Sequence, residues 1–240
     1  MSTAGGNGMR YQIHGTLHQV VELHLEQGQR VYSETGGMIW MDPQITLDTA
    51  APDGGKGLLG AIGGALSRAI AGESLFLNFF TAKSAPGRVA FASSFPGKIL
   101  DIRLGGGQSL IAQRGSFLCA EEAVQIKMEF TKRLGAGALG GEGFVLQRLT
   151  GPGLLFLEID GEVTHVDLQP GQTILVDSGH IAAFEESVSY DIHFMGMKNM
   201  LLAGEGIALA KLTGPGRVWL QHMTMQGLAG RLIPFLPIKN

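Results

Sequence analysis

The chain has 240 residues, enough for one large β domain or two small ones, each with an ample core. Charged residues make up 16% and hydrophobic residues 45%, which excludes a disordered tail. The net charge of −3 provides no overall attraction to nucleic acid or to an anionic membrane. Its 37 glycines follow no three-residue period, so collagen is excluded and many tight turns between short strands are favoured.

No targeting or membrane-spanning segment is predicted. The N-terminal residues MSTAGGNGMR lack the apolar run of a signal peptide. The longest apolar-looking stretch, Gly54–Ala71, contains two basic residues and five interior glycines, unlike a membrane-spanning helix. Peripheral contact with a membrane stays open. The single cysteine, Cys119, cannot form an internal disulfide and suits a reducing compartment, so a soluble, cytoplasmic protein is predicted.

Three segments align without gaps: Gly28–Asp48, Gly107–Lys127 and Gly171–Asp191. Each begins with Gly-Gln and contains an apolar run, a glycine, a second apolar run, an acidic turn and a final alternating run. This pattern predicts strand–turn–strand–turn–strand. The central glycines are expected at positive φ in hairpin turns; they are Gly36, Gly115 and Gly179. The acidic turns are Asp42-Pro43, Glu121-Glu122 and Glu185-Glu186.

An alternating strand precedes each Gly-Gln pair. The side chains expected to face inward are Leu23 and Leu25, Ile102 and Leu104, and Val166 and Leu168. Glycine-rich connectors, with short helical character in the first, follow each segment at roughly 50–71, 131–140 and 196–203.

Each connector leads into a strand that begins with Gly-Glu. The stretch Gly141–Gly153 (GEGFVLQRLTGPG) recurs at Gly204–Gly216 (GEGIALAKLTGPG), and a looser copy lies at Gly72–Gly87. Thr-Gly-Pro-Gly is predicted to end the strand in a turn, after which another strand follows. The C-terminal segment Gly230–Asn240 contains two prolines and is expected to be irregular.

These elements predict an all-β fold of three internal repeats of short antiparallel strands, packed about a pseudo-threefold axis, with short glycine-rich helical connectors. A single domain is expected over residues 10–238, with repeats at about 10–87, 88–153 and 154–238 and a disordered N-terminus at 1–9. One repeat alone would expose sheet edges and an unburied face. Either a shared core or three small sandwiches would satisfy the pattern.

Three of these features together resemble a known family. They are GGMIWMDPQITLDT, the glycine-rich connector before a Gly-Glu strand, and the LTGPG turn. The family is named for altered inheritance of mitochondria, occurs in bacteria and fungi, and is also known as a domain of unknown function. The resemblance covers essentially residues 10–237. It implies a fold similar to the tryptophan RNA-binding attenuation protein (TRAP-like), near the double-stranded β-helix folds, and brings no catalytic residues.

Eukaryotic members of that family look like organising factors of the mitochondrial inner membrane. This chain lacks the composition of a transit peptide, and so departs from them.

Several motifs that suggest chemistry have structural explanations. Gly135–Gly140 matches G-x-G-x-x-G, but a strand follows where a nucleotide site requires a helix. His14 and His18, with His24 nearby, have the spacing of a metal pair only on a helix, whereas strand residues four apart lie about 13 Å apart. The segment Asp177–His180 is interpreted as a turn and not as a catalytic triad. Cys119 is expected to be buried and inert.

Glu73, Glu142 and Glu205 form the candidate polar site, because each follows glycine at a strand start. Under threefold symmetry their carboxylates would converge and bind a cation. The favoured alternative is that each accepts hydrogen bonds from its own connector.

A basic set, which could contact RNA, consists of Arg103, Lys127, Lys132 and Arg133. RNA binding is disfavoured because the aromatic residues mostly occupy inward strand positions and the chain is acidic.

The predicted function is that of a non-enzymatic, homo-oligomeric scaffold or adaptor, without a cofactor, a metal site or established catalytic residues. Closed symmetry is the usual route to such assemblies. One alternative is a small-ligand or RNA-binding module, which rests on analogy with the TRAP-like fold. Another is a metal-dependent enzyme. The sequence identifies neither the protein partners nor the oligomeric number.

Overall fold

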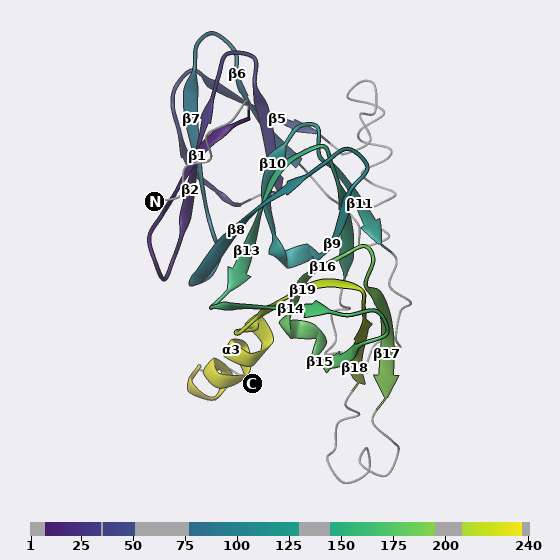
Figure 1. Ribbon diagram of the computed structural model, residues 1–240. Helices are drawn as coiled ribbons and strands as arrows, with labels where there is room; N and C mark the ends of the chain where they lie inside the picture. The colour runs from purple at the N-terminus through teal and green to yellow at the C-terminus, as the bar shows by residue number, and fades with distance from the viewer. Residues whose placement is uncertain (1–7, 35, 51–76, 130–144, 195–207, 237–240) are drawn as a thin grey trace. The chain divides into compact units, whose positions relative to one another are not determined.

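The computed structural model describes residues 8–34, 36–50, 77–129, 145–194 and 208–236 (Figure 1). Contacts group the chain into two compact units. Unit 1 comprises Met1–Gly107, Phe117–Ile126 and Gly151–Glu158, and unit 2 comprises Gln108–Ser116, Lys127–Thr150 and Ile159–Asn240. Within the described ranges nearly all regular structure is β-strand in antiparallel sheets, so the all-β prediction is confirmed.

Unit 1 contains a four-stranded and a six-stranded sheet. The four-stranded sheet has the order β1 (Arg10–His14), β2 (Val20–Leu25), β7 (Gly87–Ala92) and β4 (Met38–Met41). The six-stranded sheet has the order β5 (Ile45–Ala50), β6 (Leu77–Ala82), β3 (Arg30–Glu34), β10 (Phe117–Glu121), β13 (Gly153–Asp160) and β8 (Gly97–Leu104).

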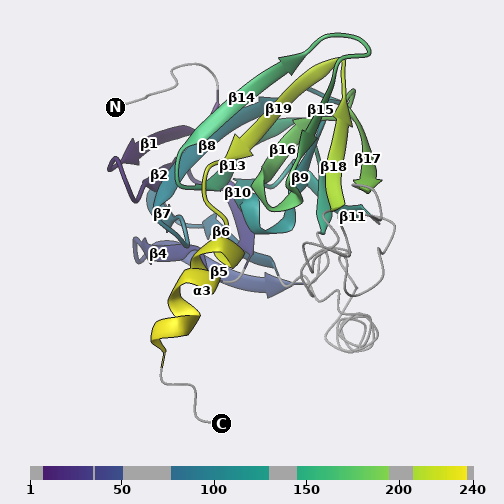
Figure 2. The same ribbon diagram turned by 90° about the horizontal axis from the view of Figure 1, so that it is seen from below.

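Unit 2 contains a six-stranded and a three-stranded sheet. The first has the order β11 (Gln125–Glu129), β12 (Leu146–Thr150), β9 (Ser109–Gln113), β16 (Ile181–Glu185), β19 (Gly216–Gln221) and β14 (Val163–Leu168). The second has the order β15 (Thr173–Val176), β18 (Ala208–Thr213) and β17 (Ser189–Phe194). Figure 2 shows β14, β19, β16 and β9 side by side.

Strand pairing follows one scheme in three consecutive sets of strands, β2–β7, β8–β13 and β14–β19. In the first set β7 lies between β2 and β4, and β6 lies between β5 and β3. In the middle set β13 lies between β8 and β10, and β12 lies between β11 and β9. In the last set β19 lies between β14 and β16, and β18 lies between β17 and β15. The strand after each Pro-Gly turn therefore pairs with strands that precede it in the same set. The repeat boundaries expected at 87 and 153 stay predictions. Packing about a pseudo-threefold axis is not tested by strand pairing and stays a prediction.

The sets are not self-contained, because β3 pairs with β10 and β9 pairs with β16. The buried cluster of unit 1 combines Leu23 and Phe80 of the first set with Cys119 and Phe156 of the middle set. In unit 2 a buried cluster combines side chains of the middle and last sets, among them Ile111, Leu146, Phe184, Leu212 and Val218. Each core thus contains strands from two sets. Three separate sandwiches would instead each have a core built from one set.

The alternating strands bury four of the six side chains predicted to face inward, whereas Ile102 and Val166 are half-buried. Val21, Leu23 and Leu25 of β2 are buried, whereas Glu22 and His24 between them are half-buried. In β14, Leu168 is buried, and His165 and Asp167, on the other side of the strand, are exposed. Period-two patterning therefore predicted which side of these strands is apolar.

The Gly-Gln pairs lie in turns in which the glutamine side chain accepts a hydrogen bond from the backbone of the same turn. Gly28 and Gly171 have φ of +85° and +78°, a region that favours glycine. The Gln29 side-chain Oε1 accepts a hydrogen bond of 2.7 Å from the Glu26 backbone N–H, and Gln172 accepts one of 2.9 Å from Gln169. The recurrence of Gly-Gln is thus explained by turn geometry.

The acidic turns have a common structural role. In each, a carboxylate oxygen accepts a hydrogen bond from the backbone N–H of the residue that follows the glycine of a Pro-Gly turn. The pairs are Asp42 with Arg88 (2.9 Å), Glu121 with Leu154 (2.8 Å) and Glu185 with Arg217 (3.0 Å). This bond ties the acidic turn to the first residues of the strand that ends the set.

Some local predictions were wrong. Gly36 has the expected positive φ (+110°), but Gly115 and Gly179 lie in 3-10 helices, Arg114–Ser116 and Ser178–His180, without positive φ. Met9, placed in the disordered N-terminus, is 3% exposed and belongs to the core of unit 1.

The C-terminal segment is also more regular than predicted. Helix α3 (Met225–Leu232) and the 3-10 helix Ile233–Phe235 occupy part of it. The helix is nucleated locally, because the Thr224 hydroxyl caps it by accepting a 3.0 Å hydrogen bond from the Gly227 N–H.

Candidate functional site

A groove in unit 2 is the candidate site. It has a volume of about 320 Å³ and lies over one face of the six-stranded sheet, next to β17. Strand register places three of its residues in a row, since Arg148 of β12 lies opposite Ile111 of β9, and Ile111 lies opposite Phe184 of β16. Its lining residues are Ile111, Glu129, Leu146, Arg148, Phe184, Glu186, Val188, Tyr190, Asp191 and Ile192.

The floor of the groove is apolar. Leu146 shares the face of β12 with Arg148, two residues away, and both line the groove. Phe184 and Val188 are buried. The Phe184 and Tyr190 rings are nearly parallel, with an interplanar angle of 6° and centroids 6.2 Å apart. Burial, and to a lesser degree the charge of Asp191, raises the pKa of the Tyr190 hydroxyl, so Tyr190 is neutral near pH 7.

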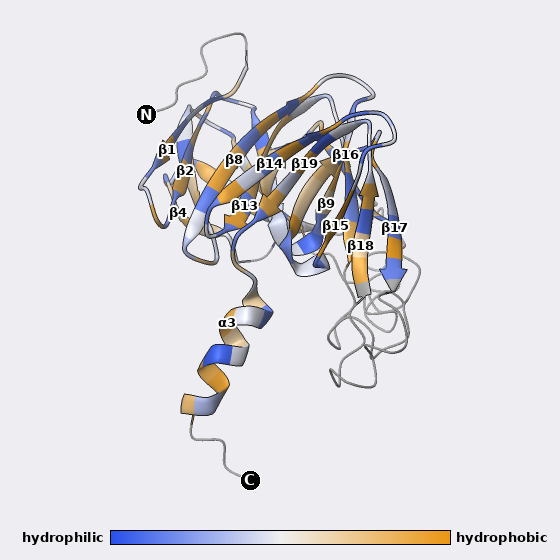
Figure 3. Ribbon diagram, turned by 60° about the horizontal axis from the view of Figure 1, so that its bottom comes forward, coloured by the Kyte–Doolittle hydropathy of each residue, from blue (hydrophilic) through white to orange (hydrophobic). Residues whose placement is uncertain are grey.

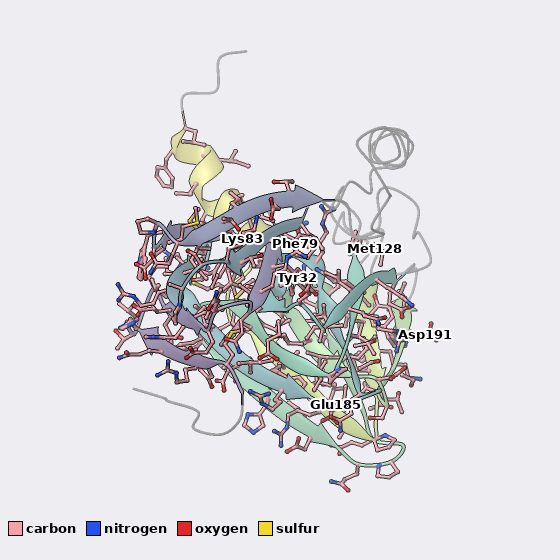
Figure 4. All side chains as sticks on the ribbon, turned by 90° about the horizontal axis from the view of Figure 1, so that it is seen from above. Tyr32, Phe79, Lys83, Met128, Glu185 and Asp191 are labelled. Carbon is pink, nitrogen blue, oxygen red and sulfur yellow. The ribbon has the colours of Figure 1, made fainter. Side chains whose placement is uncertain are left out.

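One arginine and two glutamates form an ion-paired group at the edge of the groove. The Arg148 guanidinium donates through Nε to Oε1 of Glu129 and through Nη1 to Oε1 of Glu186. Burial lowers the pKa of Arg148, but the two carboxylates outweigh it and raise that pKa above its usual value. Asp191 also lines the groove (labelled in Figure 4), and its Oδ1 accepts a 2.8 Å hydrogen bond from the Ile192 N–H.

The polar set predicted from sequence, Glu73, Glu142 and Glu205, lies outside the described residues, as does the glycine motif Gly135–Gly140. Their convergence on a cation therefore stays a prediction. Of the basic set, Lys132 and Arg133 are also outside, and Arg103 and Lys127 belong to different compact units.

The histidines are not brought together as a pair at i and i+4. His18 Nε2 lies 2.7 Å from the Ser93 carbonyl oxygen, whereas His14 and His24 lie 3.5 and 3.2 Å from the Glu22 carboxylate. Among residues with described coordinates, no group of three His, Cys, Asp or Glu side chains is arranged to hold a metal ion.

The segment Asp177–His180 is the short 3-10 helix Ser178–His180 with Asp177 as its N-cap. Asp177 Oδ1 accepts a 3.0 Å hydrogen bond from the Gly179 N–H, and His180 Nδ1 lies 2.7 Å from the Gln221 carbonyl oxygen. Cys119 is fully buried, as predicted, and burial, together with the charge of Glu158, raises the pKa of its thiol well above the usual range. Each of these groups has a structural role.

Sequence reasoning missed the groove. In the sequence Arg148 is one residue of the recurring Gly-Glu strand, and its carboxylate partners come from β11 and from the turn after β16. One signal was present, since Lys211 occupies the equivalent place in the second GEG…LTGPG stretch. A basic residue inside an apolar strand in two copies marks a position that needs a carboxylate neighbour.

Comparison with known proteins identifies the family of the chain. A family model described as mitochondrial biogenesis AIM24 matches residues 11–223, most of the sequence. The chain belongs to this AIM24 family. The resemblance found in the sequence motifs is thereby confirmed, and the family description names a process without naming a chemical activity.

Relatives of this AIM24 protein share its whole length. An uncharacterized protein of Streptococcus pyogenes serotype M6 is 32% identical over 238 residues, which cover 98% of this chain and 94% of that protein. A crystal structure of a Streptococcus pyogenes protein, solved by a structural genomics consortium, matches with a TM-score of 0.75 and 29% identity. It covers 95% of this chain and 100% of that one. These relatives support the fold and carry no assigned activity.

The helices described in this AIM24 protein are short. Where the structure describes the chain, none combines the length and the apolar character required to cross a membrane.

Proposed function

We propose that this protein is a non-enzymatic, homo-oligomeric scaffold that assembles through its C-terminal helix. The observation that supports this proposal is the exposure of α3 and the turn after it. No residue of α3 is buried. The large apolar side chains here are 48–85% exposed, and they are Met225, Leu232, Ile233, Phe235 and Leu236. Hydrophobic residues, shown in orange, are prominent along α3 in Figure 3.

The apolar residues of α3 lie on one face. Met225, Leu228, Ala229 and Leu232 are spaced at i, i+3, i+4 and i+7, so they form a single stripe along the helix. An eight-residue helix is marginal in water by itself, and most helical stability in proteins comes from packing an apolar face. The stripe therefore fits a surface that packs against a partner.

Charge favours a second copy of this chain as that partner. Residues 224–240, which include α3, contain two basic and no acidic residues, whereas residues 1–223 contain 16 basic and 21 acidic residues. The C-terminal segment of one copy is thus positive and the remainder of another copy negative, which favours their association. A closed homo-oligomer is the usual result of self-complementary contacts.

The absence of enzymatic activity is part of the proposal. It is supported by the structural roles of the nucleophile-type and base-type groups described above: Cys119 is buried in a core, and Asp177 and His180 hold a turn. A cytoplasmic location, which is supported by the single cysteine, belongs to the same proposal.

Light scattering after size-exclusion chromatography, over a range of protein concentrations, tests the proposal. Wild-type protein is expected to have a mass well above the 25.4 kDa of one chain. The variant Leu232→Ser, Ile233→Ser, Phe235→Ser is expected to dissociate toward the monomer. The matched control is Leu17→Ser in unit 1, which removes an apolar side chain that is 74% exposed and should leave the mass unchanged.

Two results would overturn the proposal. One is a monomeric wild type up to about 0.5 mM, a concentration at which even weak self-association is populated. The other is a triple variant that assembles like the wild type. Flotation with anionic lipid vesicles is run in parallel, so that a monomeric protein that floats through the same three residues is recognised as a membrane-binding one.

A further inference from the structure

The groove of unit 2 has the size and the lining of a small-ligand site. Its volume of about 320 Å³ is at the lower end of the range for ligand pockets. An apolar floor with a few polar groups at one edge is the usual composition of such sites. Here the floor is formed by Ile111, Leu146, Phe184 and Val188.

The charges at its edge determine the kind of ligand. Arg148 is paired on two sides by Glu129 and Glu186, so this group of three carries one net negative charge. Asp191, which also lines the groove, adds a second negative charge. An anionic ligand would have to displace a carboxylate from Arg148 and approach the other at close range. A cationic ligand would meet two carboxylates. Arg148 donates only to the Oε1 atom of each, so each carboxylate can accept further hydrogen bonds from the ligand.

The aromatic pair supplies the remaining contacts. Phe184 and Tyr190 line the groove with nearly parallel rings. Ring faces are negative in potential and attract an organic cation, and they also pack against an apolar body. Tyr190 is kept neutral by its raised pKa, so it adds an apolar ring with a hydroxyl.

From these contacts we propose that the groove binds a small organic cation, a primary ammonium group carried on an apolar or aromatic body. The body lies over the apolar floor, and the ammonium donates to Glu129 and Glu186. This site is independent of the oligomerisation surface proposed above, and either proposal can fail without the other.

Three probes with the same aromatic body and different head groups test the proposal by isothermal titration calorimetry. They are phenethylamine (cationic), 2-phenylethanol (neutral) and 3-phenylpropionate (anionic). Wild-type protein is expected to bind the amine up to about fivefold more tightly than the alcohol, the size of effect that one partly exposed ion pair provides. The acid should bind weakest, and added salt should weaken the amine alone.

Charge variants test the roles of the two carboxylates. Glu186→Gln removes one of the two carboxylates proposed to accept from the ammonium. It should therefore weaken binding of the amine toward that of the alcohol. The double variant Glu129→Gln, Glu186→Gln leaves Arg148 without either carboxylate and should reverse the order, so that the acid binds best. Glu122→Gln is the matched control, because Glu122 is 54% exposed in an ion pair with Arg30 in unit 1, close to the 51% of Glu186.

The ranking on wild-type protein decides the proposal even if the double variant does not fold, which its thermal unfolding curve would reveal. The proposal is overturned if the acid binds wild-type protein as well as the amine, or if no amine binding is seen up to about 10 mM. It is also overturned if Glu122→Gln weakens amine binding as much as Glu186→Gln does.

Discussion

The Pro-Gly turn before β13, the last strand of the middle set, offers a quantitative test of the packing. Gly153 has φ of +148°, which disfavours any residue with a side chain. A Cβ atom there would lie 2.7 Å from Val124 Cγ2 and 3.1 Å from Glu121 Oε2. Val124 is buried, and the Glu121 carboxylate holds the Leu154 N–H, so neither neighbour can move freely.

Gly153→Ala should therefore destabilise unit 1 by two additive effects. Backbone strain costs about 1–3 kcal/mol, and overpacking against Val124 costs about 1–3 kcal/mol. The expected loss is about 2–6 kcal/mol, a large fraction of the roughly 5–15 kcal/mol that stabilises a typical domain. Gly107→Ala is the matched control in the same unit, since φ is +78° but nothing lies within 4 Å of its Cβ. Strain alone predicts about 1–2 kcal/mol there.

Urea unfolding followed by circular dichroism measures both losses from the shift of the midpoint at constant slope. The reasoning requires Gly153→Ala to lower the midpoint substantially more than Gly107→Ala does. Equal shifts would show that the close contact with Val124 and Glu121 does not constrain this turn.

Two further predictions concern ionisable groups. A hydrogen bond from Arg88 lowers the pKa of Asp42 in the folded protein below its unfolded-state value of about 4. The Asp42 carboxylate therefore stabilises the fold above that unfolded-state pKa, and this stabilisation is lost as the pH falls through the lower pKa of the folded state. Wild-type protein should thus lose more stability than Asp42→Asn between about pH 5 and pH 2, and parallel curves would contradict this. Because its pKa is raised by burial, Cys119 should react with a thiol reagent at about pH 8 only after unfolding in guanidinium. Rapid labelling of folded protein would refute that.

Local patterning predicted most strands and their inward faces. The buried side chains of β2 and Leu168 of β14 follow from alternation, and the turns follow from glycine, proline and acidic residues. Helix α3 was not predicted because its two glycines and the prolines after it argue against a helix. Its apolar residues nevertheless recur at i, i+3, i+4 and i+7, which is the spacing of a helix face. The positive φ predicted for Gly115 and Gly179 was wrong because the same short polar and glycine-containing sequence can form a 3-10 helix as well as a hairpin turn.

The candidate site was beyond this kind of reasoning. Glu129 and Glu186 are separated from Arg148 by 19 and 38 residues, and each looks like an ordinary polar residue at the end of a strand. Their proximity depends on which strands pair and on how β17 covers the sheet, and alternation does not specify either.

The sequence by itself determined the all-β character, the family and the recurring turns, because these depend on backbone preferences of residues close together in the chain. Tertiary structure decided that β3 pairs with β10 and β9 with β16, so that each core is built from two strand sets. It also determined that Arg148 lies between two carboxylates over an apolar floor. The physical reason is that unpaired strand edges and apolar faces must be covered, and only the folded chain determines which distant segment covers them.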